Sequence, residues 1–241
     1  MSTGSKQQRG AALLMLLMIA GLLGAFFAMR TLGSASQQMQ QITDTTAALT
    51  QAKEALIGYA ASHNETNLPN THAYLPCPDK TTALPAGGTA NDGQEDRVGG
   101  ACVVQEGNLP WVTLGITGTD SWGNRLRYSV TTALSNSVNG MTTSSGTLTV
   151  NDAAGVLLAS SVPAVILSHG PNGYGATSSS GAALPLPPLA NANETENTTL
   201  NSVFVSSPPV ATGVVGGEFD DLTTWLDAAT LQTRMHAAGK L

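Results

Sequence analysis

The chain has 241 residues, of which 41% are hydrophobic and only 11% are charged. This length is enough for one domain and a flanking segment, and so few charges are unusual for a cytosolic protein. Lys6, Arg9 and Arg30 are three of the ten basic residues, so residues 31–241 carry seven basic residues against all sixteen acidic ones. Nucleic-acid backbones require basic surfaces, so we expect no direct nucleic-acid partner.

The first predicted element is an apolar helix over residues 11–30. The segment Ala11–Met29 contains no charged residue, and as a helix it would be about 28 Å long. That length is close to the ~30 Å of the bilayer hydrocarbon core, so the sequence predicts a transmembrane helix. Lys6 and Arg9 precede it, which predicts a cytoplasmic N-terminus and an exported body.

Arg9-Gly10 lies directly at the edge of this apolar run. A basic leader that ends in Gly resembles the leader of type IV prepilins and type II secretion pseudopilins. The resemblance implies cleavage by a prepilin peptidase between Gly10 and Ala11, followed by methylation of the new N-terminus. It also implies a single-pass protein of the bacterial inner membrane, with its C-terminal domain in the periplasm or in an extracytoplasmic filament. Most members carry Phe first and Glu fifth after the cut. This chain has Ala11 and Met15, which favours a minor subunit.

A second helical stretch is predicted over residues 31–62. One apolar stripe recurs every seven residues, at Ala35, Ile42, Leu49 and Leu56. Packing of this stripe on a sheet is favoured, with a coiled-coil stalk as the alternative. The predicted organisation is a leader (1–10), a transmembrane helix (11–30), an amphipathic continuation (31–62) and an exported β-rich, pilin-like domain (63–241).

A loop rich in Pro, Gly and Asn follows residue 63 and contains both cysteines, Cys77 and Cys102. In an exported domain, two cysteines at the ends of such a loop are expected to form a disulfide, with two free thiols as the alternative. A bridge that closes about 26 residues stabilises a fold by roughly 3 kcal/mol. The histidines are scattered and no CxxC is present, so the sequence assigns no metal to this region.

The run Asp120-Ser121-Trp122-Gly123-Asn124 predicts a turn that leads into a strand through Tyr128. Asp120 is expected to bind turn amides, Trp122 to cover the sheet edge, and Gly123 to adopt a positive φ. The D-x-W-G-N-x-x-x-Y pattern resembles the start of the sheet in the major pseudopilin of type II secretion. Further strands are predicted at Thr147–Val150, Val156–Ala159, Ala164–Leu167 and Val203–Val205.

Two segments of the second half are predicted to lack regular structure. Residues 168–176, SHGPNGYGA, predict a tight turn, because their glycines match neither dinucleotide-binding nor phosphate-loop spacing. Residues 177–199 are of low complexity and predict a mobile excursion.

The chain closes with EFDDLTTWLDAATLQTRMHAAGKL, which predicts a short helix capped by Asp220 or Asp221. The FDDLTTW segment resembles the acidic-then-Trp C-terminal segment of pseudopilins. Acidic side chains there bind calcium in some members, so the resemblance implies calcium at Asp220 and Asp221. Helix capping explains both residues equally well, and no other cofactor is expected.

The predicted fold class is therefore α+β and pilin-like. A long N-terminal helix, membrane-spanning in its first half, is expected to pack on a small antiparallel β-sheet. The resemblance implies a minor pseudopilin or prepilin-like structural subunit of a type II secretion or type IV pilus filament, with a part in protein secretion. The implied partners are other pilin-like subunits, the prepilin peptidase, the inner-membrane assembly platform and membrane lipid.

Two other classes of function were weighed. An enzyme is not expected, because no G-x-S-x-G is present and the adjacent Ser168 and His169 would point to opposite faces of a strand. The alternative to a filament subunit is a single-pass, membrane-anchored exported binding module or adhesin that does not assemble.

Overall fold

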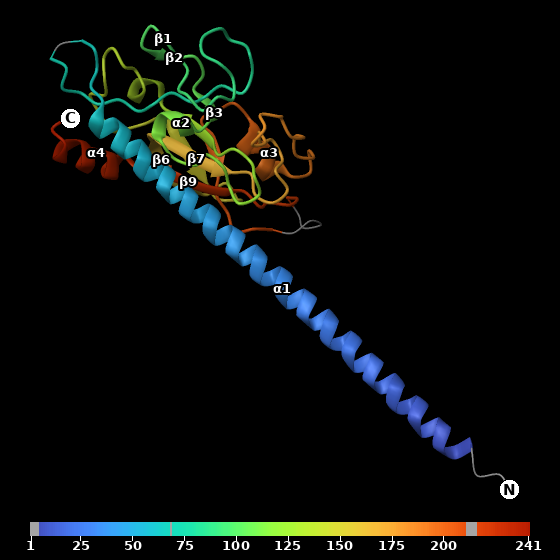
Figure 1. The fold of residues 1–241 in the computed structure, drawn as a ribbon. Coiled ribbons are helices and arrows are strands. Elements are labelled where there is room, and N and C mark those ends of the chain that lie inside the picture. The colour runs from blue at the N-terminus through green and yellow to red at the C-terminus, as the bar shows by residue number, and fades with distance from the viewer. Residues whose placement is uncertain (1–4, 68, 211–215) are drawn as a thin grey trace. The chain divides into compact units, whose positions relative to one another are not determined.

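The structure is a computed structural model that describes the backbone of residues 5–67, 69–210 and 216–241 (Figure 1). Side chains of residues 5–13 and 23–35 lie outside the described part. The chain divides into two compact units, Met1–Thr43 and Asp44–Leu241, and each is described by itself.

Helix α1 spans Ser5–Ser62, so the predicted long N-terminal helix is present. Among the described residues, however, no helix offers an apolar stretch long enough to cross a membrane. The predicted transmembrane helix over 11–30, and with it the single-pass inner-membrane localisation, is therefore corrected. The expectation rested on the uncharged run Ala11–Met29 and on its length of about 28 Å as a helix.

In the described part of the second unit the strands form three sheets rather than one. Strands β1 (Arg97–Val98) and β2 (Ala101–Cys102) form an antiparallel ribbon. The second sheet is antiparallel, with the order β3 (Glu106–Asn108), β4 (Arg127–Val130), β7 (Ala164–Ser168) and β9 (Leu222–Leu226). The third has the order β6 (Leu157–Val162), β5 (Leu148–Asn151) and β8 (Val203–Val205).

The prediction of a single small antiparallel sheet was therefore wrong, and the fold is mixed α/β. Strand β8 runs parallel to β5, with Val150 paired to Phe204. Parallel neighbours require a long crossover, which the chain between β5 and β8 supplies. From sequence alone, residues 131–217 are predicted only to be rich in strands and loops.

The predicted strand positions are confirmed within a few residues for β4, β5, β6, β7 and β8. The C-terminal prediction was wrong in part, because Leu222–Leu226 forms β9 and pairs with β7 over five residues. The short helices are α2 (Trp111–Leu114), the 3-10 turn η1 (Thr132–Leu134), α3 (Ala192–Thr198) and α4 (Ala228–Ala237). Helix α4 is capped by Asp227, whose carboxylate accepts from the Thr230 amide, rather than by Asp220 or Asp221.

The core of the second unit forms where the Asp44–Ser62 part of α1 packs on the four-stranded sheet. Leu49 and Leu56 belong to the same buried cluster as Tyr128 and Ile166, and all four side chains are almost or fully buried. Within this unit the apolar stripe at Leu49 and Leu56 therefore packs on a sheet, as predicted, and its side chains are removed from water.

Candidate metal centre

The predicted turn motif forms as expected. The Asp120 Oδ1 accepts hydrogen bonds from the Trp122 amide (3.0 Å) and the Asn124 amide (2.9 Å), and Gly123 has a φ of +84°. Trp122 is partly buried. Tyr128 is fully buried, and its hydroxyl donates to the Pro76 carbonyl at 3.1 Å. The motif thus fixes the start of β4.

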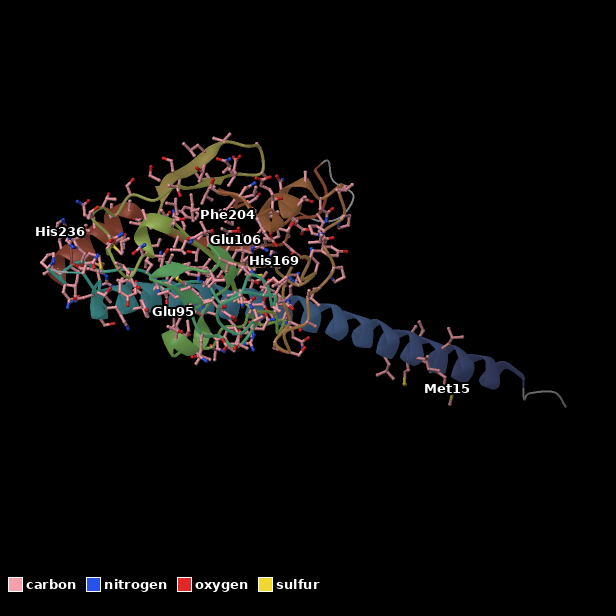
Figure 2. All side chains as sticks on the ribbon, turned by 90° about the horizontal axis from the view of Figure 1, so that it is seen from above. Met15, Glu95, Glu106, His169, Phe204 and His236 are labelled. Carbon is pink, nitrogen blue, oxygen red and sulfur yellow. A yellow bond between two sulfur atoms is a disulfide. The ribbon has the colours of Figure 1, made fainter. Side chains whose placement is uncertain are left out.

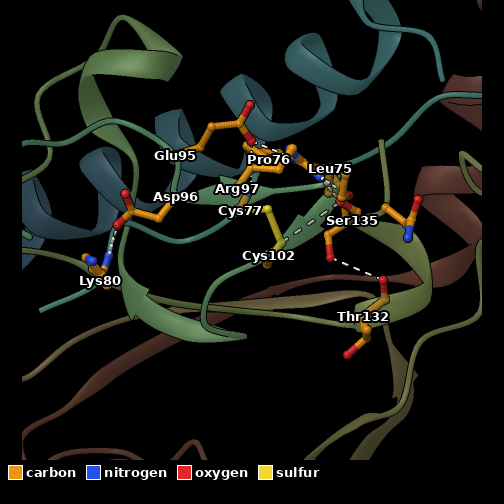
Figure 3. Close-up of a disulfide and its surroundings, with 12 residues drawn as sticks. Leu75, Pro76, Cys77, Lys80, Glu95, Asp96, Arg97, Cys102, Thr132 and Ser135 are labelled. Carbon is orange, nitrogen blue, oxygen red and sulfur yellow. Dashed lines mark hydrogen bonds and ion pairs between the residues drawn. A yellow bond between two sulfur atoms is a disulfide. The ribbon is translucent and has the colours of Figure 1, made fainter. Parts of the chain in front are cut away.

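Cys77 and Cys102 are joined in a disulfide, with their Cα atoms 5.1 Å apart (Figure 3). The Glu95 carboxylate accepts from the Cys77 amide at 2.9 Å and pairs with Arg97 at 2.8 Å. The Arg97 guanidinium also donates to the Ser135 carbonyl. The bridge and this ion pair together hold the loop after α1 against the β1–β2 ribbon.

Three carboxylates converge at the end of the four-stranded sheet. Glu194 lies on α3, whereas Asp220 and Asp221 directly precede β9. One oxygen from each lies within 4.8 Å of the others. Glu194 and Asp221 are almost fully buried. The structure thus brings both sequence-predicted acidic residues together and adds Glu194 to them.

Asparagine side chains and turn amides hold these carboxylates in place. Glu194 accepts from the Asn172 side-chain amide at 2.7 Å and from the Asn191 side-chain amide at 2.9 Å. Asp221 accepts from the Asn197 side-chain amide at 2.8 Å. The Asp220 Oδ2 accepts from the Asn172 backbone amide at 3.2 Å, but its Oδ1 is buried without a hydrogen-bond partner. An orphaned carboxylate oxygen costs free energy unless a proton or a cation satisfies it.

The pKa shifts of these carboxylates also favour a bound proton or cation. Burial, reinforced by the carboxylates of Glu194 and Asp221, raises the pKa of Asp220 to about 7. Burial also raises the pKa of Glu194. In the described part of the chain no Lys or Arg pairs with any of the three. Oxygen ligands with excess negative charge suit a hard divalent cation such as Ca²⁺, so these residues fit the ion that the resemblance implies.

His169 borders the cluster, with its Nδ1 3.5 Å from the Asp221 Oδ1. The side chain is 1% exposed, and neither ring nitrogen has a hydrogen-bond partner. The neighbouring Ser168 hydroxyl donates instead to Asp120 at 2.7 Å. Ser168 and His169 therefore do not share a hydrogen bond of the kind that activates a serine nucleophile.

Glu194 is not among the site residues predicted from sequence, because residues 177–199 predict a mobile excursion. That interpretation was wrong for Ala192–Thr198, which forms α3 and buries Glu194 completely. The available signal was the pair Glu194 and Glu196, the only acidic residues of an otherwise uncharged stretch.

The predicted processing residues, Gly10 and Ala11, lie in the backbone of α1, and their side chains are outside the described part of the structure. No known family model, curated protein or solved structure matches this chain.

Proposed function

We propose that this chain is a minor structural subunit of a pilin-type filament and that it joins the filament through α1. The observation that carries the proposal is a run of exposed apolar side chains on this helix. From Leu14 to Ile19, six consecutive apolar side chains are each 58–70% exposed, and Leu22 is 71% exposed.

Consecutive positions of a helix cover its whole circumference, because 3.6 residues make one turn. A helix that is apolar on every side is stable only when its whole surface is covered. Fully covering one Leu or Ile side chain is worth about 1.5–3 kcal/mol. In a filament, the apolar helices of neighbouring subunits would bury these side chains, and α1 would bury theirs in turn. The prepilin-like leader that ends at Gly10 supports the same function.

Charge placed on this helix tests the proposal. We expect Leu16→Asp and Leu17→Asp to abolish recovery of the chain in sheared filament fractions, because a carboxylate is costly in an apolar helix contact. The matched control is Leu189→Asp, which adds the same charge at a side chain 91% exposed in the second unit. Equal recovery of all variants would refute assembly through α1.

We also propose that Glu194, Asp220 and Asp221 hold a calcium ion. The specific observation is the buried Asp220 Oδ1, which has no hydrogen-bond partner beside two further carboxylates. A bound calcium ion would supply positive charge to this cluster and tie α3 to the segment before β9.

Thermal unfolding of the full chain with calcium or with a chelator tests this second function. We expect calcium to raise the Tm of the natural chain, and Glu194→Gln or Asp221→Asn to remove the increase. Glu196→Gln is the matched control, because it removes a carboxylate on the same helix outside the cluster. A calcium-dependent increase that survives in Glu194→Gln would exclude the cluster as the site.

A further inference from the structure

A cavity of about 280 Å³ opens beside the four-stranded sheet and is used by neither proposed function. Its polar wall comes from β3, from the residues around the start of β4 and from the turn after β7. Its residues include Glu106, Arg125, Arg127 and His169. The three carboxylates of the candidate calcium site do not line it. Glu106 and His169 are labelled in Figure 2, within the second unit.

The wall of this cavity carries a guanidinium, that of Arg125, whose charge is offset at longer range by the Asp79 carboxylate rather than by an ion pair. Arg127 forms an ion pair with Glu106, so these two charges cancel. Arg125 makes no ion pair with a described carboxylate, and its Nε is buried without a hydrogen-bond partner. Its guanidinium lies 3.7 Å from the centre of the Trp111 ring and donates to the Ser179 carbonyl at 2.9 Å. These contacts hold a planar cation in one orientation at the cavity.

The mouth of the cavity is apolar. Leu186 and Leu200 line it and are 73% and 79% exposed. Leu184 adds a third aliphatic side chain. Exposed leucines beside a fixed guanidinium favour a ligand with a charged end and an aliphatic part, because each end then finds its preferred surroundings.

We propose that this cavity binds a carboxylate next to an aliphatic group, as found at the C-terminus of a polypeptide that ends in Leu or in a free branched-chain acid. A carboxylate matches the planar guanidinium of Arg125 with paired hydrogen bonds. Glu106 also lines the cavity, so a singly charged carboxylate meets less repulsion there than a doubly charged phosphate would. The cavity of about 280 Å³ lies just below the ~300–1,000 Å³ of pockets that hold drug-sized ligands, so it suits only a small group.

Calorimetric titration of the full chain tests the proposal, with Trp fluorescence as a second readout because Arg125 stacks on Trp111. The probes are N-acetyl-Ala-Ala-Leu with a free carboxylate, the same peptide as its C-terminal amide, and isovalerate. We expect saturable binding of the free peptide and at least about tenfold weaker binding of the amide, the usual loss for a charge-assisted hydrogen-bond pair. Equal binding of acid and amide, or no saturable binding of any probe, overturns the proposal.

The isovalerate titration distinguishes the two sources of the ligand. Affinity equal to that of the free peptide supports the proposal with a free branched-chain acid as the ligand. Weaker binding than the peptide supports it with a polypeptide C-terminus as the ligand, because the chain before the last residue then contributes contacts.

Two variants with matched controls locate the site. We expect Arg125→Gln and Leu200→Ser each to weaken binding of the free peptide about tenfold. Arg234→Gln also removes one positive charge, and Leu189→Ser also shortens an exposed leucine, but neither residue lines the cavity. Leu200→Ser keeps the test decisive if Arg125→Gln fails to fold. Unchanged affinity in a folded Leu200→Ser protein, or equal loss in the controls, places the binding elsewhere.

Discussion

The Asp120 carboxylate lies 2.7 Å from the Ser168 hydroxyl and accepts its hydrogen bond, across 48 positions of sequence. The other carboxylate oxygen accepts from the amides of Trp122 and Asn124. One side chain therefore closes the turn before β4 and fixes the end of β7. The residue after Ser168 is His169, which borders both the acidic cluster and the cavity.

Replacement of Asp120 by Ala is expected to destabilise the second unit by about 2–4 kcal/mol, because it leaves the buried Ser168 hydroxyl and two turn amides without their acceptor. Urea unfolding of the natural and variant chains measures the change. Asp152→Ala is the matched control, since Asp152 makes the same kind of turn contacts to Ala154 and Val156 at an exposed site. Equal losses in the two variants would contradict a special role of the buried carboxylate.

Loss of the disulfide is expected to lower the free energy of unfolding by about 3 kcal/mol, because the bridge between Cys77 and Cys102 spans 25 positions and restricts the unfolded chain. Denaturant unfolding of a Cys77→Ser, Cys102→Ser double variant measures this change. Reduction of the natural chain should give a similar loss, whereas a reductant should leave the double variant unaffected. A natural chain that keeps its stability after complete reduction would argue against this role of the bridge.

The stability of the calcium-free chain is expected to fall as the pH rises from about 4 to 7. The folded-state pKa of Asp220 is raised from 3.8 to about 7 by burial and by neighbouring carboxylates. The folded state then binds more protons than the unfolded state within this window, so deprotonation favours unfolding. The contribution is on the order of 2 kcal/mol and is fully present below the unfolded-state pKa. Chelator-treated protein unfolded by urea at a series of pH values provides the measurement.

The matched variant for this pH dependence is Asp220→Asn, which keeps the shape of the side chain and removes its titration. We expect the variant to lose most of the decrease between pH 4 and 7. Burial also raises the pKa of the neighbouring Glu194, so some pH dependence remains in the variant. An unchanged profile in the variant would assign the decrease to other groups.

The leader makes a separate prediction about processing. We expect the mature chain to begin at a methylated Ala11 in cells that contain a prepilin peptidase, and to retain residues 1–10 in cells that lack it. Intact mass and N-terminal sequencing measure both states. A bulky residue at the cut, as in Gly10→Leu, should prevent the change. Retention of residues 1–10 in both strains would remove the leader as support for a filament subunit.

Several elements were predictable because their signals are local. The Asp120 turn follows from five adjacent residues, and the strand at Val203–Val205 follows from its own side chains. Two of the three carboxylates of the acidic site are predictable from sequence. Asp220 and Asp221 are adjacent in sequence, but Glu194 comes from a segment whose composition indicates no structure, and only α3 brings it to them.

The long helix α1, the main strands and the cysteine pair are predictable from sequence, because hydrophobic periodicity, turn residues and cysteine positions are local patterns. Three features emerge only in the folded chain: the parallel pairing of β5 with β8, the third carboxylate at Glu194 and the position of Arg125 at the cavity. Each of these depends on contacts between residues far apart in sequence. Such contacts are selected by the total area buried and by the pairing of polar groups, which no short pattern of residues encodes.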